Sequence, residues 1–208
     1  MISKISSGIV DLLVNNNIIE VEQVQIYQYG FEIFTSSILT FLIAFLCGIA
    51  LKCVFAAFLY FILFAILRSI CGGYHAETYW QCNLIFAVVT LSVLLFYKYL
   101  SLEEFNTFHY ISVLLSVLVA FYYAPVENPN KPLSEKQKKI FRFVGTAMIV
   151  LLALISSVLM IKYRNKCCIL IDMTLFIVSI SMFVTDPRRG GEQSWAKLLR
   201  RCSWRQLL

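Results

Sequence analysis

The sequence predicts an all-α protein that crosses a membrane about six times and begins with an amphipathic helix. Of its 208 residues, 60% are hydrophobic and 14% are charged. Soluble domains carry about 25% charged residues, so this composition is typical of a membrane protein. The apolar residues gather in six segments, and most of these approach the ~20 residues that a helix needs to cross a bilayer.

Residues 1–14 carry the pattern of an amphipathic helix within a polar N-terminal region, residues 1–30. Apolar side chains recur there at helical spacing, and the pattern ends at three consecutive asparagines. The apolar positions are Ile2, Ile5, Ile9 and Leu12. Such a helix lies on the membrane surface or packs on the rest of its own protein, because either arrangement needs one apolar stripe.

Six apolar segments follow, within residues 33–185. They cover residues 33–51, 53–67, 83–100, 107–124, 143–161 and 167–185. Little more than Lys52 separates the first segment from the second, and one helix through both would be about 52 Å long, which is too long for a membrane. We therefore expect a tight hairpin, with Lys52 and Arg68 reaching opposite surfaces. The second segment is short, so it crosses with tilt or local thinning of the bilayer, or enters it only partially.

The basic residues predict the orientation of the chain. If the N-terminus is cytoplasmic, 13 of the 18 lysines and arginines lie inside and 5 lie outside. Cytoplasmic loops of membrane proteins carry the excess of basic residues. Both termini, the loop 68–82, the loop 125–142 and the basic tail 186–208 are therefore expected on the cytoplasmic side.

The basic cytoplasmic face has two explanations. Topology alone requires such a bias and no ligand. The face would also suit an acidic partner, either an anionic lipid membrane or an acidic peptide. We expect no nucleic-acid partner, because the basic residues lie against a membrane and no nucleic-acid-binding motif accompanies them.

The cysteines do not predict a metal site. Seven cysteines are scattered along the chain without a CxxC pair. An odd number at irregular spacing argues against a disulfide framework or a zinc knuckle. His75 and Cys82 are seven residues apart, no third ligand lies nearby, and we expect neither a metal nor a cofactor.

His75 and Cys82 are better suited to nucleophilic catalysis. A histidine can take the proton of a cysteine and leave a thiolate, which is the reactive form of the side chain. Cys82 stands just before the third apolar segment, where the positive end of a helix dipole would favour the thiolate. Arg68 adds positive charge, while Glu77, Gln81 and Asn83 are candidates to orient the imidazole or to form an oxyanion hole.

The spacing of the pair constrains the backbone. On one straight helix, positions 75 and 82 would share a face but lie about 10.5 Å apart along the axis. Either the helix does not run unbroken from His75 to Cys82, or the two partners come from two subunits. Gly72 and Gly73 permit a break just before His75, because glycine accepts positive φ. We expect a loop or re-entrant turn that carries His75 back over the start of the third segment.

The run from Arg68 through Gly72, Gly73 and His75 to Cys82 resembles the AgrB family. This family comprises membrane cysteine endopeptidases of Gram-positive bacterial quorum sensing. The resemblance extends to the proline-containing loop 124–134, the length of the chain, the number of spans and the amphipathic start.

The resemblance implies an active site and a reaction. The catalytic residues of the family match His75 and Cys82, and its motif arginine and glycine match Arg68 and Gly73. The implied substrate is an AgrD-like propeptide with an acidic C-terminal tail, which is removed before the peptide closes into a thiolactone or lactone. The implied protein is a homodimer in the plasma membrane, with one protease domain over residues 1–208.

A small membrane transporter or peptide exporter is the alternative function. A transport site would need polar or ionisable groups within the spans. Such groups are scarce, and Asp172 in the sixth segment is the best candidate. A placement near the outer surface, paired with Lys166, is the other expectation for Asp172.

Overall fold

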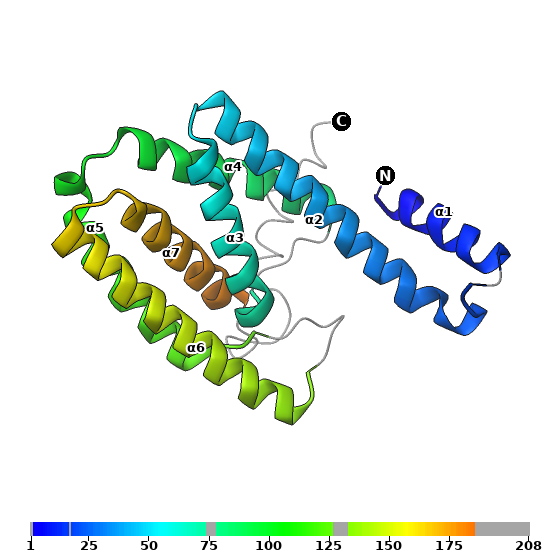
Figure 1. Ribbon diagram of the computed structural model, residues 1–208. Coiled ribbons are helices and arrows are strands. Elements are labelled where there is room, and N and C mark those ends of the chain that lie inside the picture. Colours follow the sequence, from blue (N-terminus) through cyan, green and yellow to red (C-terminus); the bar gives the residue numbers. More distant parts are fainter. Residues whose placement is uncertain (1, 17, 74–77, 127–132, 186–208) are drawn as a thin grey trace, which may run out of the picture. The chain divides into compact units, whose positions relative to one another are not determined.

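The protein is predominantly helical in the region described by a computed structural model, residues 2–16, 18–73, 78–126 and 133–185 (Figure 1). The α-helices of this region are α1 (Ile2–Asn15), α2 (Val24–Ala50), α3 (Val54–Cys71), α4 (Tyr79–Tyr99), α5 (Leu102–Tyr123), α6 (Glu135–Val158) and α7 (Cys167–Thr185). A short 3-10 turn, η1 (Val21–Gln23), precedes α2, and a π-helical turn, η2 (Leu159–Tyr163), extends α6. Six of these helices are long and apolar enough to cross a membrane. The predicted fold class is confirmed.

Several helices begin earlier than their apolar segments. Ser101 accepts a hydrogen bond from the backbone N–H of Glu104 at 3.3 Å and starts α5. Ser134 caps α6 in the same way, through the N–H of Gln137 at 3.3 Å. Each arrangement is a capping box, because the Glu104 or Gln137 side chain in turn accepts a hydrogen bond from the backbone N–H of the serine. The caps extend these helices into polar sequence that hydropathy alone does not assign to a span.

The predicted hairpin between the first two spans is confirmed. Helix α2 ends at Ala50, and α3 begins at Val54. Between them Lys52 adopts φ 56°, a left-handed conformation that turns the chain. A Cβ added at Gly48 would lie 2.7 Å from the Cβ of Ala57, so the absent side chain allows the two helices to approach closely. Two helices replace the single 35-residue helix that would exceed the bilayer.

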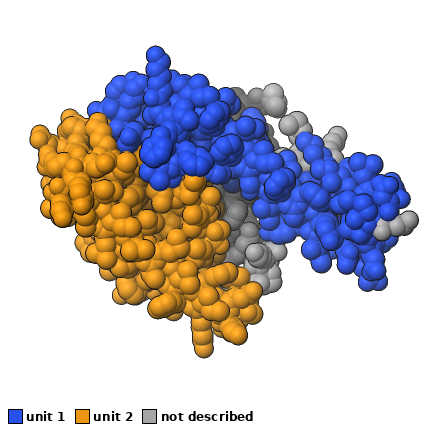
Figure 2. Space-filling model, viewed as in Figure 1, with its two compact units in different colours: residues 1–61, 75–99 blue, residues 62–74, 100–208 orange. Residues whose placement is uncertain are grey.

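The chain falls into two compact units, coloured separately in Figure 2. Unit 1 contains residues 1–61 and 75–99, and unit 2 contains residues 62–74 and 100–208. The single protease domain expected over residues 1–208 stays a prediction.

In unit 1, α2 packs against both α1 and α4. Helix α1 lies alongside the N-terminal half of α2 (Figure 1), and its residues Ser6 and Val10 are buried. Leu12 on the same helix remains 62% exposed. Packing on its own protein therefore accounts for some of the α1 surface, and contact of α1 with a membrane surface stays a prediction.

Unit 2 is built around α7, which packs against both α5 and α6. Helix α7 is the most buried of the six candidate spans, with 56% of the residues in its most apolar stretch buried. Its residues Leu175, Val178 and Met182 join a core cluster that includes Leu67 and Cys71 of α3. The C-terminal end of α3 is thereby fixed to the same helices that surround α7.

A buried polar cluster joins α5, α6 and α7. The Nδ1 atom of His109 lies 2.7 Å from an oxygen of Asp172, and the hydroxyl of Ser156 donates to the other oxygen at 2.6 Å. His109 is 1% exposed, while Asp172 and Ser156 are fully buried. Asp172 therefore does not lie at the surface beside Lys166, and that expectation was wrong. Hydropathy could not reveal a partner on a helix 63 residues away.

We expect that the single replacement of Asp172 by Leu lowers the free energy of unfolding by about 1 to 3 kcal/mol, because His109 and Ser156 lose a buried partner. Thermal melting of the detergent-solubilised protein measures the change. The double variant His109→Leu/Asp172→Leu should recover some of the loss, since it also removes the imidazole that the single replacement leaves without a partner. Asp11→Asn, on an exposed residue of α1, is the matched control. A melting temperature of Asp172→Leu equal to that of the wild type would contradict the stabilising role of this buried polar cluster.

Candidate active site

The C-terminal end of α3 is closed by the Arg68 side chain. Its Nη1 atom donates to the carbonyl oxygen of Gly72 at 2.9 Å and to the hydroxyl of Ser181 on α7 at 3.2 Å. The last carbonyls of a helix lack partners within the helix, and a basic side chain in the last turn also complements the helix dipole. Arg68 therefore fixes the direction in which the chain leaves α3.

Gly72 and Gly73 form the turn that Arg68 holds. Their φ angles are 72° and 123°, in the region that side chains other than glycine rarely adopt. A Cβ at Gly73 would collide with the Arg68 guanidinium and with Ser181, and a Cβ at Gly72 would collide with the carbonyl oxygen of Val126. Both positions therefore require glycine, for conformation and for space.

The chain after α5 is attached to the same turn. The backbone N–H of Val126 donates to the carbonyl oxygen of Cys71 at 2.9 Å. Ala124 and Val126 are buried in the core cluster of unit 2. The start of the loop 124–134 and the glycine turn thus form one structure, although positions 73 and 126 are 53 residues apart in the sequence.

Cys82 lies in the first turns of α4. The hydroxyl of Thr78 accepts a hydrogen bond from the N–H of Gln81 at 3.3 Å, and the N–H of Cys82 donates to the carbonyl oxygen of Thr78 at 3.1 Å. The helix begins at Tyr79, earlier than the apolar segment, and Cys82 is its fourth residue. The thiol is half-buried. A sulfur at this end of a helix is close to the positive pole of the helix dipole.

The structure describes three of the four predicted site residues, and these three belong to two different units. Arg68 and Gly73 lie in contact within unit 2, whereas Cys82 belongs to unit 1. His75 lies outside the described residues, as does Glu77. Since α4 begins at Tyr79, the helix does not run unbroken from position 75 to Cys82, which is one of the two arrangements that the spacing allowed. The pairing of His75 with Cys82 stays a prediction.

Two further contacts near these residues escaped the sequence analysis. Ser181 accepts from Arg68, and the Tyr79 hydroxyl donates to a carboxylate oxygen of Glu32 at 2.8 Å. Glu32 had one signal in the sequence, because it is the only charged residue in α2. Ser181 had none, since it is one of several serines in apolar helices.

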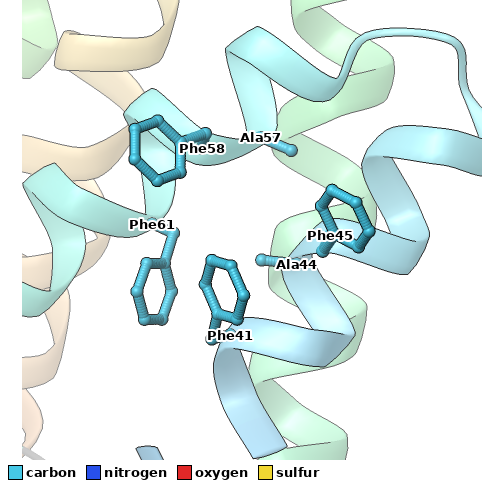
Figure 3. A pocket seen from close by; sticks show the side chains of 6 residues that line it. All are labelled: Phe41, Ala44, Phe45, Ala57, Phe58 and Phe61. Carbon is cyan, nitrogen blue, oxygen red and sulfur yellow. The ribbon is translucent and has the colours of Figure 1, made fainter. Parts of the chain in front are cut away.

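In the part of the chain that the structure describes, neither a metal site nor the small pocket between α2 and α3 offers an alternative active site. Among the described residues, no group of three or more His, Cys, Asp or Glu side chains is arranged to hold a metal ion. A small pocket between α2 and α3 is lined by alanine and phenylalanine side chains alone (Figure 3). There the Phe41 and Phe61 rings meet edge to face, with centroids 5.4 Å apart. This pocket offers no group that could act on a peptide bond.

We expect Gly73→Ala to lower the melting temperature of the purified protein, because the added Cβ displaces Arg68 or Ser181 and the backbone is strained at φ 123°. A cost of about 1 to 3 kcal/mol is typical of such strain. Gly30→Ala is the matched control, since nothing lies within 4 Å of a Cβ at this helical glycine. Equal melting temperatures for the two variants would contradict the steric argument.

Comparison with known proteins extends over nearly the whole chain. The family model for accessory gene regulator B matches residues 6–183. A putative AgrB-like protein of Clostridium beijerinckii is 28% identical over 173 residues, covering 82% of this chain and 83% of the relative. A putative AgrB-like protein of Clostridium perfringens strain SM101 is 25% identical over 150 residues, covering 69% and 70%. Protein FsrB of Enterococcus faecalis is 22% identical over 148 residues, covering 71% and 60%. No solved structure matches. The fold, the span of the family match and these relatives together show that the chain belongs to the AgrB family, whose members take part in quorum-sensing peptide processing.

Proposed function

We propose that this protein is a cysteine endopeptidase that removes the C-terminal tail of an AgrD-like propeptide and promotes closure of the remaining peptide into a ring. The observation that carries the proposal is the placement of Cys82 in the first turns of α4, seven residues after His75 and after a turn that only glycine can form. Membership of the AgrB family supports the substrate class.

The reaction uses the two side chains in sequence. His75 takes the proton of the Cys82 thiol, and the thiolate attacks the scissile carbonyl carbon of the propeptide. His75 then gives this proton to the leaving amine as the carbon–nitrogen bond breaks, which releases the acidic tail. The rest of the peptide remains bound to Cys82 as a thioester.

Ring closure follows without an external energy source. A thiol or hydroxyl within the bound peptide attacks the thioester carbonyl, a thiolactone or lactone forms, and Cys82 leaves with a proton. Water would compete for the same carbonyl, so exclusion of water from the site favours the ring. An active site at the edge of a membrane span suits this requirement.

Arg68 supports this chemistry through the backbone rather than through the substrate. Its guanidinium is engaged with Gly72 and Ser181. Gly73 lies two residues before His75 in the sequence, so the turn that Arg68 holds fixes the chain just ahead of the proposed base. We therefore assign Arg68 and Gly73 the role of positioning residues.

Helix α6 offers charges for the acidic tail of the substrate. Lys136 and Lys139 are exposed in its first two turns. Lys138 pairs with Glu135 at 2.8 Å, and Arg142 donates to the carbonyl oxygen of Phe121 at 3.0 Å. Exposed lysines attract an acidic segment and increase the rate at which it associates.

In the proposed topology this end of α6 is cytoplasmic, with both termini and the active site, in the plasma membrane of a Gram-positive bacterium. The active form is proposed to be a homodimer.

Asp172, the best candidate for a transport site in the exporter alternative, is engaged within the protein. Asp172 is enclosed by His109 and Ser156, and both of its oxygens have partners. Polar groups that satisfy one another between packed helices are sufficient to explain a buried carboxyl. No observation on the described spans favours transport over processing.

We expect Cys82→Ala and His75→Ala each to abolish cleavage of a co-expressed AgrD-like propeptide, because each removes one partner of the proton transfer. Mass spectrometry of the culture and of the cell membranes identifies intact propeptide, released tail and cyclic product. Cys167→Ala, a half-buried cysteine at the start of α7, is the control and should cleave normally. Membrane fractions must contain all three variants in comparable amounts. Normal cleavage by either His75→Ala or Cys82→Ala would refute the proposed dyad.

A further inference from the structure

The first turn of α4 is attached to α2 by one hydrogen bond. The Tyr79 hydroxyl donates to the Oε2 atom of Glu32 at 2.8 Å, in a partly buried position. Both residues belong to unit 1, where α2 and α4 pack against each other. The two residues are 47 positions apart in the sequence, so the bond is a long-range contact.

Glu32 is an unusual residue for its position in α2. It is the only charged residue in α2, a helix with 27 residues that is otherwise mostly apolar. A carboxyl group in an apolar span is costly unless it finds a partner. Hydrogen bonds to a carboxylate are shorter and roughly twice as strong as neutral ones. Tyr79 is thus the partner that makes this carboxylate tolerable at the edge of the span.

Cys82 lies one turn further along α4 than Tyr79. Residues three apart on a helix are neighbours on one face. The first turn of a helix lacks some of its backbone hydrogen bonding and frays readily. A side-chain bond at the first residue of α4 therefore limits the motion of the turn that carries the thiol. Displacement of a reacting group by about 1 Å can cost a hundredfold in rate.

We propose that Glu32 and Tyr79 are positioning residues for Cys82, and that their hydrogen bond keeps the nucleophile in its reactive place relative to α2. The proposal rests on the proposed function, because it assumes that Cys82 is the nucleophile. Neither residue touches the substrate in this scheme. Their effect is on the rate of the chemical step and not on the binding of the propeptide.

The fold of α4 does not depend on this bond. Asn83, Phe86, Thr90, Val93 and Leu94 are buried along the helix. The Phe86 ring also stacks on the Tyr60 ring of α3, with centroids 6.3 Å apart. Loss of the Tyr79 hydroxyl should therefore leave the helix in place and free only its first turn. This separates a positioning role from a purely structural one.

The experiment measures kcat and KM for cleavage of an AgrD-like propeptide by the full-length protein in lipid vesicles. Tyr79→Phe and Glu32→Ala should each lower kcat about tenfold, with KM within about twofold of the wild-type value. The double variant should be no slower than the slower single variant, since both remove the same bond. Glu32→Gln keeps an oxygen acceptor and should recover most of the loss. Tyr99→Phe at the other end of α4 and Glu22→Ala in η1 are matched controls and should behave as the wild type.

The outcomes separate this proposal from the proposed function. Cleavage by Cys82→Ala, run in the same series, would refute the proposed function and this inference with it. If Cys82 is essential but Tyr79→Phe and Glu32→Ala retain wild-type kcat, the positioning role alone is refuted. Multiplying effects in the double variant would refute it too, because independent losses mean that the two residues do not act through one bond. A fall in kcat that matches a fall in folded protein, measured by thermal melting, would also overturn it.

Discussion

The guanidinium of Arg68 holds the point at which α3 ends and the glycine turn begins. It joins the carbonyl oxygen of Gly72 to the hydroxyl of Ser181, and it occupies the space that a side chain at position 73 would need. The turn is bound again by Val126, whose N–H donates to Cys71. Helix α7, the most buried span, thereby supports a loop segment two residues from His75. Arg68 and Gly73, which stand apart in the sequence motif, therefore act as a single steric and hydrogen-bonded unit.

The two halves of the motif depend on different supports. Arg68 and Gly73 rely on the helices of unit 2, chiefly on Ser181 of α7. Cys82 relies on the cap of α4 at Thr78 and on the bond between Tyr79 and Glu32, all within unit 1. A buried polar cluster also joins the helices of unit 2, where Asp172 holds His109 and Ser156. In a membrane the hydrophobic effect does not drive helices together, so such polar contacts specify which faces meet.

The sequence predicted the features that depend on local composition. Six spans and the break at Lys52 follow from hydropathy and bilayer thickness, and the left-handed conformation of Lys52 agrees with them. The early starts of α5 and α6 were missed, although the Ser-x-x-Glu and Ser-x-x-Gln patterns at Ser101 and Ser134 were visible. The long-range partners could not be predicted. His109 is 63 residues from Asp172, Ser181 is 113 residues from Arg68, and Tyr79 is 47 residues from Glu32. Spacing along one chain carries no information about which helix faces meet.

The central claim is that His75 and Cys82 meet, and a disulfide trap tests it most directly. In a chain whose other cysteines are replaced by serine or alanine, His75→Cys is oxidised in native membranes, and the products are resolved on non-reducing gels. If the two residues meet, a disulfide with Cys82 forms rapidly, either within one chain or as a linked dimer, because the Cα atoms of bonded cysteines lie about 4.4 to 6.8 Å apart. Trp80→Cys in the same background is the control, since residues two apart on a helix point away from each other. No disulfide at position 75, under conditions that trap a known pair, would contradict the account.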